Sequence, residues 1–116
     1  MAYVDGFIIP IQKKNLKAYK KMALLGKKAW MKCGALDYKE CVGDDLAAKW
    51  GTPFPRMMKL RAGETAIFAF IVFKSRAHRD SVNAKVMKEM TDAPKEMPFD
   101  MKRMAYGGFK VLVDGK

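Results

Sequence analysis

Glu64-Thr-Ala-Ile-Phe-Ala-Phe-Ile-Val-Phe-Lys-Ser-Arg-Ala-His-Arg-Asp-Ser-Val-Asn-Ala-Lys-Val-Met-Lys-Glu-Met90 is the stretch of sequence that determines the fold. Residues 65–73 are rich in aromatic and β-branched side chains and contain no Gly or Pro, which predicts a strand. Because side chains alternate between the two faces of a strand, both faces of this one are apolar. One face carries Ala66, Phe68, Phe70 and Val72, and the other carries Ile67, Ala69, Ile71 and Phe73. Ser75 is a suitable N-cap, and the residues after it have helical spacing over 76–91.

A strand that is apolar on both faces must be covered on both sides. The helix that follows it accounts for one face. In a chain of 116 residues we expect the other face to pack against a second copy of the chain, which predicts a homodimer.

The rest of the chain completes a βαββαβ order. Strands are predicted at 3–11, 36–42 and 105–113, and a long amphipathic helix at 13–33, which ends before Gly34. This order predicts an α+β fold, a ferredoxin-like antiparallel sheet with both helices on one face, as a single domain over 1–116. We expect 46–62 to be a long hairpin connection in which 57–60 adds some pairing, and 93–100 to be a connection punctuated by proline.

Composition excludes several classes of protein. No apolar run approaches the roughly 20 residues needed to cross a bilayer, and nothing resembles a signal peptide, so we expect a cytoplasmic protein without a membrane partner. Cys33 and Cys41 lack metal-ligand spacing and the chain has one His, so we expect reduced, buried thiols and no metal site. Phosphate-loop, dinucleotide, serine-hydrolase and zinc-protease motifs are absent, and we expect no cofactor.

The formal charge of +11 arises largely from one predicted element. Residues 6–36 contain eight lysines and no acidic residue, and all eight lie opposite the apolar face of the predicted helix. Such a face could bind a polyanion through Lys13, Lys17, Lys20, Lys21 and Lys28. However, arginines and exposed aromatics that read or stack bases are not interleaved with them, so a solvated face is favoured over nucleic-acid binding.

The second predicted helix holds polar side chains where apolar ones are expected. Arg79 and Asn83 project into its sheet-facing arc, and His78 lies at the edge of that arc. Asp5 and Glu40 are carboxylates on strands that could face this helix. One interpretation is a polar pocket in which His78 and Asp5 are catalytic and the ligand is bound by Glu40, Arg79, Asn83 and Tyr106. The other is a structural ion pair beside a solvated histidine.

Methionines are frequent after residue 57 and could line an adaptable apolar cavity beneath the 97–104 connection. This pattern suggests that a small, mostly apolar molecule is bound between sheet and helices. Polyanion binding and a purely structural or interaction role are the alternatives.

Four segments also resemble a known family. They are Tyr3-Val-Asp-Gly-Phe7, Glu40-Cys-Val-Gly-Asp-Asp45, Ser75-Arg-Ala-His-Arg-Asp-Ser-Val-Asn-Ala-Lys-Val-Met87 and Met97-Pro-Phe-Asp-Met-Lys-Arg-Met-Ala-Tyr-Gly-Gly-Phe109. Together they resemble the YbaA-like family of small uncharacterised bacterial proteins. The resemblance implies a dimeric α/β barrel, in which two ferredoxin-like sheets pack face to face, and it implies no established activity.

Overall fold

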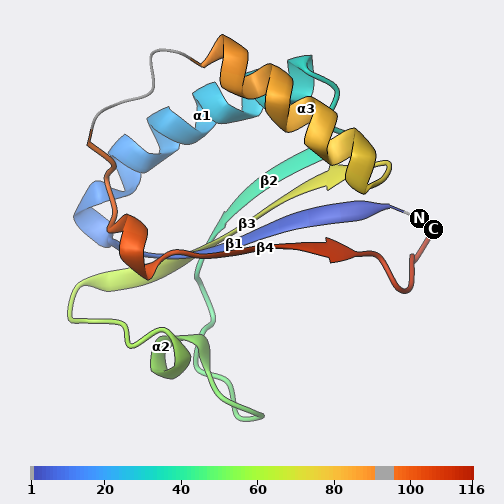
Figure 1. Cartoon of the computed structure of the whole chain (residues 1–116). Helices are drawn as coiled ribbons and strands as arrows, with labels where there is room; N and C mark the ends of the chain where they lie inside the picture. The colour runs from blue at the N-terminus through green and yellow to red at the C-terminus, as the bar shows by residue number, and fades with distance from the viewer. Residues whose placement is uncertain (1, 91–95) are drawn as a thin grey trace.

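Four antiparallel strands form one sheet in the order β2-β3-β1-β4, and two long helices cover one of its faces (Figure 1). The computed structural model describes residues 2–90 and 96–116. Its strands are β1 (Tyr3–Gln12), β2 (Asp37–Val42), β3 (Glu64–Phe73) and β4 (Ala105–Lys110). Its helices are η1 (Lys13–Asn15), α1 (Leu16–Lys32), α2 (Phe54–Met57), α3 (Arg76–Glu89) and η2 (Met101–Arg103). The predicted ferredoxin-like fold is confirmed.

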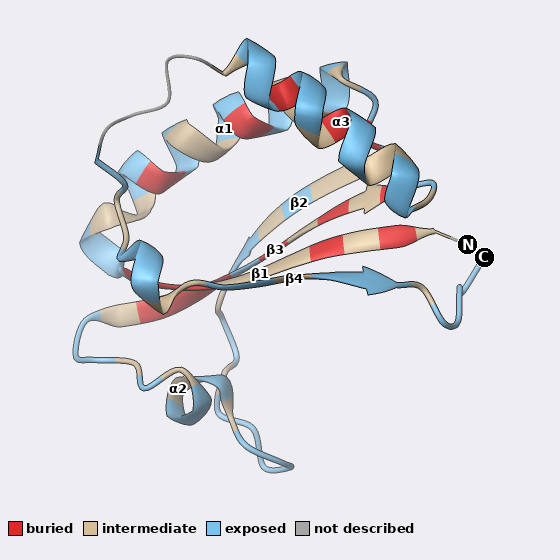
Figure 2. Ribbon diagram, in the orientation of Figure 1, coloured by how far each residue is buried: buried red, intermediate tan, exposed pale blue. Residues whose placement is uncertain are grey.

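The two apolar faces of β3 have different surroundings. Its odd-numbered residues Ile67, Ala69, Ile71 and Phe73 are buried under the helices. Val82 and Val86 of α3 pack into the same core, which follows the middle of the sheet (Figure 2). The register places Tyr3 opposite Phe73, so the inward side chains of β1 continue this layer. The arrangement leaves β2 and β4 as the edge strands.

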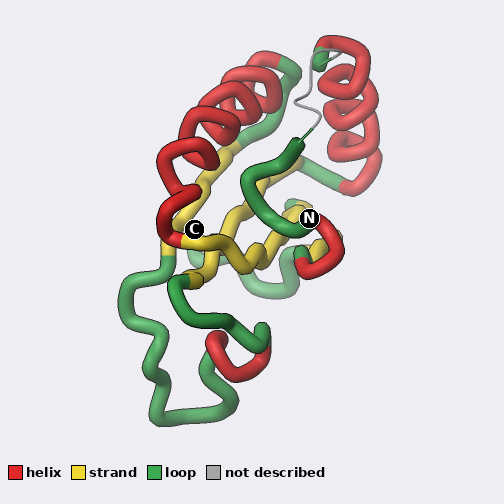
Figure 3. The backbone as a smooth tube through the Cα atoms, turned by 90° about the vertical axis from the view of Figure 1, so that its left-hand side faces the viewer, coloured by secondary structure: helices red, strands yellow, loops and turns green. Residues whose placement is uncertain are grey.

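The other face of the sheet carries apolar side chains that neither α1 nor α3 covers. Phe68 is 47% exposed and Phe109 is 61% exposed on this face, which we call the open face. The segment between β2 and β3, including α2, extends away from the helical layer on this side of the sheet (Figure 3).

Three predicted details differ from the structure. Residues 57–60 add no pairing, because Pro53 and Pro55 start the short helix α2 instead. The last strand ends at Lys110, so Leu112 and Val113 are exposed beyond it. Both cysteines are free thiols, but neither is buried as predicted. Cys33 is half-buried, and Cys41 is exposed because its side chain lies on the open face, beside Phe68.

Two predicted boundaries lie partly outside the described residues. The helix predicted over 76–91 ends at Glu89, and residue 91 is not described. Residues 93–95 of the predicted connection over 93–100 are likewise not described. Within the described part of the chain, no helix is long and apolar enough to cross a bilayer.

Candidate functional site

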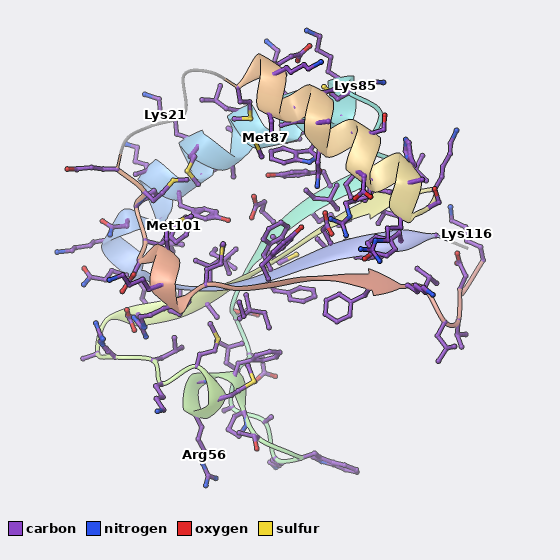
Figure 4. The ribbon with its side chains drawn as sticks, in the orientation of Figure 1. Lys21, Arg56, Lys85, Met87, Met101 and Lys116 are labelled. Carbon is purple, nitrogen blue, oxygen red and sulfur yellow. The ribbon has the colours of Figure 1, made fainter. Side chains whose placement is uncertain are left out.

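A cavity of about 230 Å³ lies between the sheet and the helices. We call it the inner cavity. Its floor comes from β1, β2 and β3, and α1 contributes one wall. Five methionines line it, and Met101 reaches it from η2 (Figure 4). Among its lining residues are Phe7, Ile9, Trp30, Ala69 and Ile71, together with Met22, Met90, Met97, Met101 and Met104. The cavity is therefore almost entirely apolar.

Glu40 is the carboxylate in the wall of the inner cavity. The Tyr19 hydroxyl donates a hydrogen bond of 2.5 Å to Glu40 Oε1, and the Tyr38 hydroxyl donates one of 2.7 Å to Oε2. Burial, followed by the neighbouring carboxylate, raises the pKa of both tyrosines. Both phenols therefore stay neutral donors at physiological pH, and they fix the position of the Glu40 side chain.

Gly26 makes room for this arrangement in the middle of α1. A Cβ atom at this position would lie 2.8 Å from the Tyr38 hydroxyl oxygen, which is too close for a real contact. Glycine costs a helix interior roughly 1 kcal/mol relative to alanine. Its presence here is explained by the close approach of the Tyr38 side chain.

A second hollow, of about 370 Å³, lies on the other side of Glu40, between α1 and the edge strand β2. We call it the edge groove. Tyr19, Ala23, Tyr38 and Glu40 line both hollows. The glutamate and its two tyrosines thus form part of a partition between the inner cavity and the edge groove.

Asp5 forms a separate polar cluster with α3. It is 1% exposed, and its Oδ1 lies 3.6 Å from Nε of Arg79. The Arg79 Nη2 donates a hydrogen bond of 3.0 Å to the Tyr3 hydroxyl, and its guanidinium carbon lies 5.0 Å from the centre of the Tyr3 ring. Neither Asp5 Oδ1 nor Arg79 Nε has a hydrogen-bond partner among the described residues. The two side chains form an ion pair without a short hydrogen bond between these atoms.

Burial raises the pKa of the Asp5 carboxyl, although the nearby Arg79 charge and the polar groups of Asn83 and Tyr106 act in the opposite direction. Asn83 also accepts a hydrogen bond of 3.0 Å from the Trp30 indole. The Tyr106 ring stacks on Phe7 at 4.7 Å between centroids. Trp30 and Phe7 line the inner cavity, so this cluster lies directly behind one of its walls.

His78 lies at the first turn of α3. Its backbone N–H donates to the Ser75 Oγ at 3.1 Å, which confirms the predicted cap. Its Nδ1 accepts a hydrogen bond from the backbone N–H of Lys74 at 3.0 Å, and its ring stands edge-on to Phe73. Because Nδ1 is engaged as an acceptor, the proton of the neutral ring is assigned to Nε2.

The structure therefore brings together some of the predicted site residues and separates others. Asp5, Arg79, Asn83 and Tyr106 form one cluster, whereas Glu40 lines the two hollows. His78 lines neither of them. Sequence reasoning missed the tyrosines that hold Glu40. Tyr38 and Glu40 share a face of β2 at a spacing of two residues, and that alternation is the signal that could have identified one of them.

The five lysines of the predicted polyanion surface are all exposed: Lys13, Lys17, Lys20, Lys21 and Lys28. None of them forms an ion pair with a described residue. In the same described part of the chain, no group of three or more His, Cys, Asp and Glu side chains is arranged to hold a metal ion.

Comparison with known proteins gives one family and several relatives. Residues 2–101 match the model of a family described as protein of unknown function, DUF1428. The chain is 35% identical over 116 residues to uncharacterized protein YbaA of Escherichia coli strain K12, and the match covers 98% of this chain and 99% of that one. The Shigella flexneri protein of the same name matches equally well. The de novo designed protein Foldit4 is 10% identical with a TM-score of 0.48, covering 96% and 99% of the two chains.

Proposed function

The chain belongs to the DUF1428 family of proteins of unknown function, and we propose that it binds a small, mostly apolar molecule in the inner cavity. The observation that carries the proposal is the Glu40 carboxylate, held by two tyrosines in the wall of an otherwise apolar cavity. Binding sites of this kind combine an apolar lining with a few fixed polar groups that orient the ligand. Glu40 would accept a hydrogen bond from a hydroxyl or amino group of the ligand.

The volume limits the size of this ligand. A dry apolar cavity of about 150 Å³ is known to hold benzene, and the inner cavity is larger at about 230 Å³. A molecule with one or two fused rings fits this space. The lining methionines have flexible side chains that adjust to ligands of different shape.

The proposal is tested with 2-naphthol as the probe and naphthalene as the probe that lacks the hydroxyl. Chemical shifts of methionine methyl groups labelled with ¹³C report the place of binding. We expect shifts at Met22, Met90, Met97, Met101 and Met104, and none at the exposed Met57 and Met87. We expect 2-naphthol to bind more tightly than naphthalene, because only the former donates to Glu40.

A pair of matched variants locates the site. Ala69→Leu fills the inner cavity, since Ala69 is buried in its floor, and should abolish the shifts. Ala77→Leu makes the same change at an exposed position of α3 and should leave them intact. Unchanged methyl spectra at millimolar probe, or equal binding by the two variants, would contradict the proposal.

We also propose that two copies pair through the open face. Phe68 and Phe109 are exposed there, next to the half-buried Val4, Ile8 and Phe70. A contiguous apolar patch of this kind is typical of an interaction surface. Sedimentation analysis at micromolar concentration should give a dimer for the native chain. Phe68→Lys should give a monomer, while Met87→Lys, on the exposed side of α3, should remain a dimer.

Polyanion binding is the second candidate, supported by Lys13, Lys17, Lys20, Lys21 and Lys28, which are exposed and form no ion pair with a described residue. Retention on heparin as a function of salt tests it. Elution below 0.2 M salt would indicate general charge attraction, whereas a native chain retained well above it and a weaker Lys17→Gln/Lys21→Gln variant would support a site. A purely structural role would be favoured if neither heparin nor the naphthol probe binds.

A further inference from the structure

The edge groove has the dimensions of a binding site in its own right. Its volume of about 370 Å³ falls within the roughly 300–1,000 Å³ typical of ligand pockets. One continuous stripe of α1 forms one wall, and the inward side chains of β2 form the other: Leu16, Tyr19, Lys20, Ala23, Leu24 and Lys27 face Tyr38, Glu40 and Val42. From residue 16 to residue 27 the helix rises about 16 Å. The groove is therefore long enough for an extended chain.

Large apolar side chains are left exposed along this groove. Leu24 is 54% exposed and Val42 is 53% exposed. Val42 belongs to β2, the outermost strand of the sheet, and Leu24 lies on α1. Isolated exposed apolar residues are common, but these two line the same groove from opposite sides. An apolar chain lying between Leu24 and Val42 would cover both side chains.

Two lysines stand on the same stripe of the helix as these apolar residues. Lys20 and Lys27 line the groove seven residues apart, with Leu24 between them. Neither forms an ion pair with a described residue, and residues 6–36 contain no acidic side chain. The acidic side chain in the groove is Glu40, which lies on the β2 wall, across the groove from the helix that carries the two lysines. The rim on the α1 side therefore favours an anion.

From these features we propose that the edge groove binds an amphiphilic anion, a free molecule with an apolar chain and a terminal carboxylate or phosphate. The chain would lie between Leu24 and Val42, and the anionic group would contact Lys20 or Lys27. A polyanion would use the lysines but leave the apolar walls exposed. A neutral apolar molecule would fill the walls but leave the lysines without partners. An amphiphilic anion complements both.

Decanoate and decyl phosphate, below their micelle concentrations, are the probes, and acetate is the anion without a chain. We expect calorimetry to show binding of both long-chain probes and none of acetate. Lys20→Gln/Lys27→Gln should weaken decanoate binding by about fivefold, the effect of losing one or two exposed charge contacts. The matched variant Lys21→Gln/Lys28→Gln removes the same charge from the same helix but from residues outside the groove, and should change the affinity less than twofold.

Two further variants separate this site from the inner cavity. Leu24→Asp places a charge in the apolar wall and should abolish decanoate binding without affecting 2-naphthol. Ala69→Leu should do the reverse. Equal losses in the two double-lysine variants, loss of decanoate binding in Ala69→Leu, or no binding at 1 mM decanoate would each overturn the proposal. The first would indicate general charge attraction, and the second would place decanoate in the inner cavity.

Discussion

Asp5 and Glu40 are both carboxylates on inward-facing positions of the sheet, yet their surroundings differ in kind. Asp5 on β1 is enclosed and faces the guanidinium of Arg79. Glu40 on β2 is half-buried and accepts hydrogen bonds from two neutral phenols. One carboxylate is paired with an opposite charge in a filled region of the core. The other is held by neutral groups beside two hollows.

This difference separates a group that supports the fold from a group suited to binding. Removing a charge from water is costly unless a partner compensates it. Arg79 offsets part of that cost for Asp5, and the enclosed position of Asp5 leaves little room for a ligand to approach it. The tyrosines orient Glu40 but, as neutral groups, supply no opposite charge. A ligand that donates a hydrogen bond or carries a positive group would therefore interact more favourably with Glu40 than with Asp5.

Removing the cation beside Asp5 should produce the largest effect. We expect Arg79→Met to lower the free energy of unfolding by about 3 kcal/mol at pH 7, because it leaves a buried carboxylate without its partner. Denaturant unfolding measures the change. Arg76→Met removes an exposed arginine three residues earlier on α3 and should cost less than about 0.5 kcal/mol. Similar losses for the two variants would mean that the ion pair contributes little.

Removing the carboxylate from the second network should cost less. We expect Glu40→Leu to lower the free energy of unfolding by about 2 kcal/mol, because it leaves the hydroxyls of Tyr19 and Tyr38 without their acceptor. Glu40→Gln keeps one acceptor oxygen and should cost about 1 kcal/mol. The same unfolding assay measures both. A loss in Glu40→Leu that matches or exceeds that in Arg79→Met would erase the contrast between the two carboxylates.

The sequence predicted the fold well because its elements follow from local patterns. The two-sided apolar strand β3, the lysine-rich helix α1 and the cap at Ser75 are each encoded in a short segment. It also predicted that Asp5, Arg79 and Asn83 belong together, since each is a polar group on an apolar face. The structure places Glu40 in a separate hydrogen-bond network with Tyr19 and Tyr38, and the position of its strand at the edge of the sheet could not be read from a local pattern. Tyr19 occupies a position on the apolar face of the predicted helix, so the pattern alone does not predict that its hydroxyl donates a hydrogen bond to β2.

Gly26 offers a sharper test of the Glu40 network. In an ordinary helix interior, Gly→Ala stabilises by about 1 kcal/mol. Here the new Cβ would lie 2.8 Å from the Tyr38 hydroxyl oxygen but 3.7 Å from the ring carbon that bears it. We therefore expect Gly26→Ala to destabilise the native chain and to stabilise a Tyr38→Phe variant by about 1 kcal/mol. A double-mutant cycle measures this reversal of sign. Additive effects in the cycle would show that Tyr38 does not require the glycine.

The smallest expected effect is the pH dependence due to Asp5. Burial raises its pKa in the folded chain above the ordinary value of 3.8 in spite of Arg79. Between these two pKa values the folded state binds more protons than the unfolded state, so the stability contributed by Asp5 falls as pH rises through that window. The unfolding free energy of the native chain minus that of Asp5→Asn should therefore decrease from pH 4 upward and level off above the folded pKa. A difference that increases with pH would mean that the folded pKa of Asp5 is lowered. Arg79 would then more than compensate the cost of burying this carboxylate.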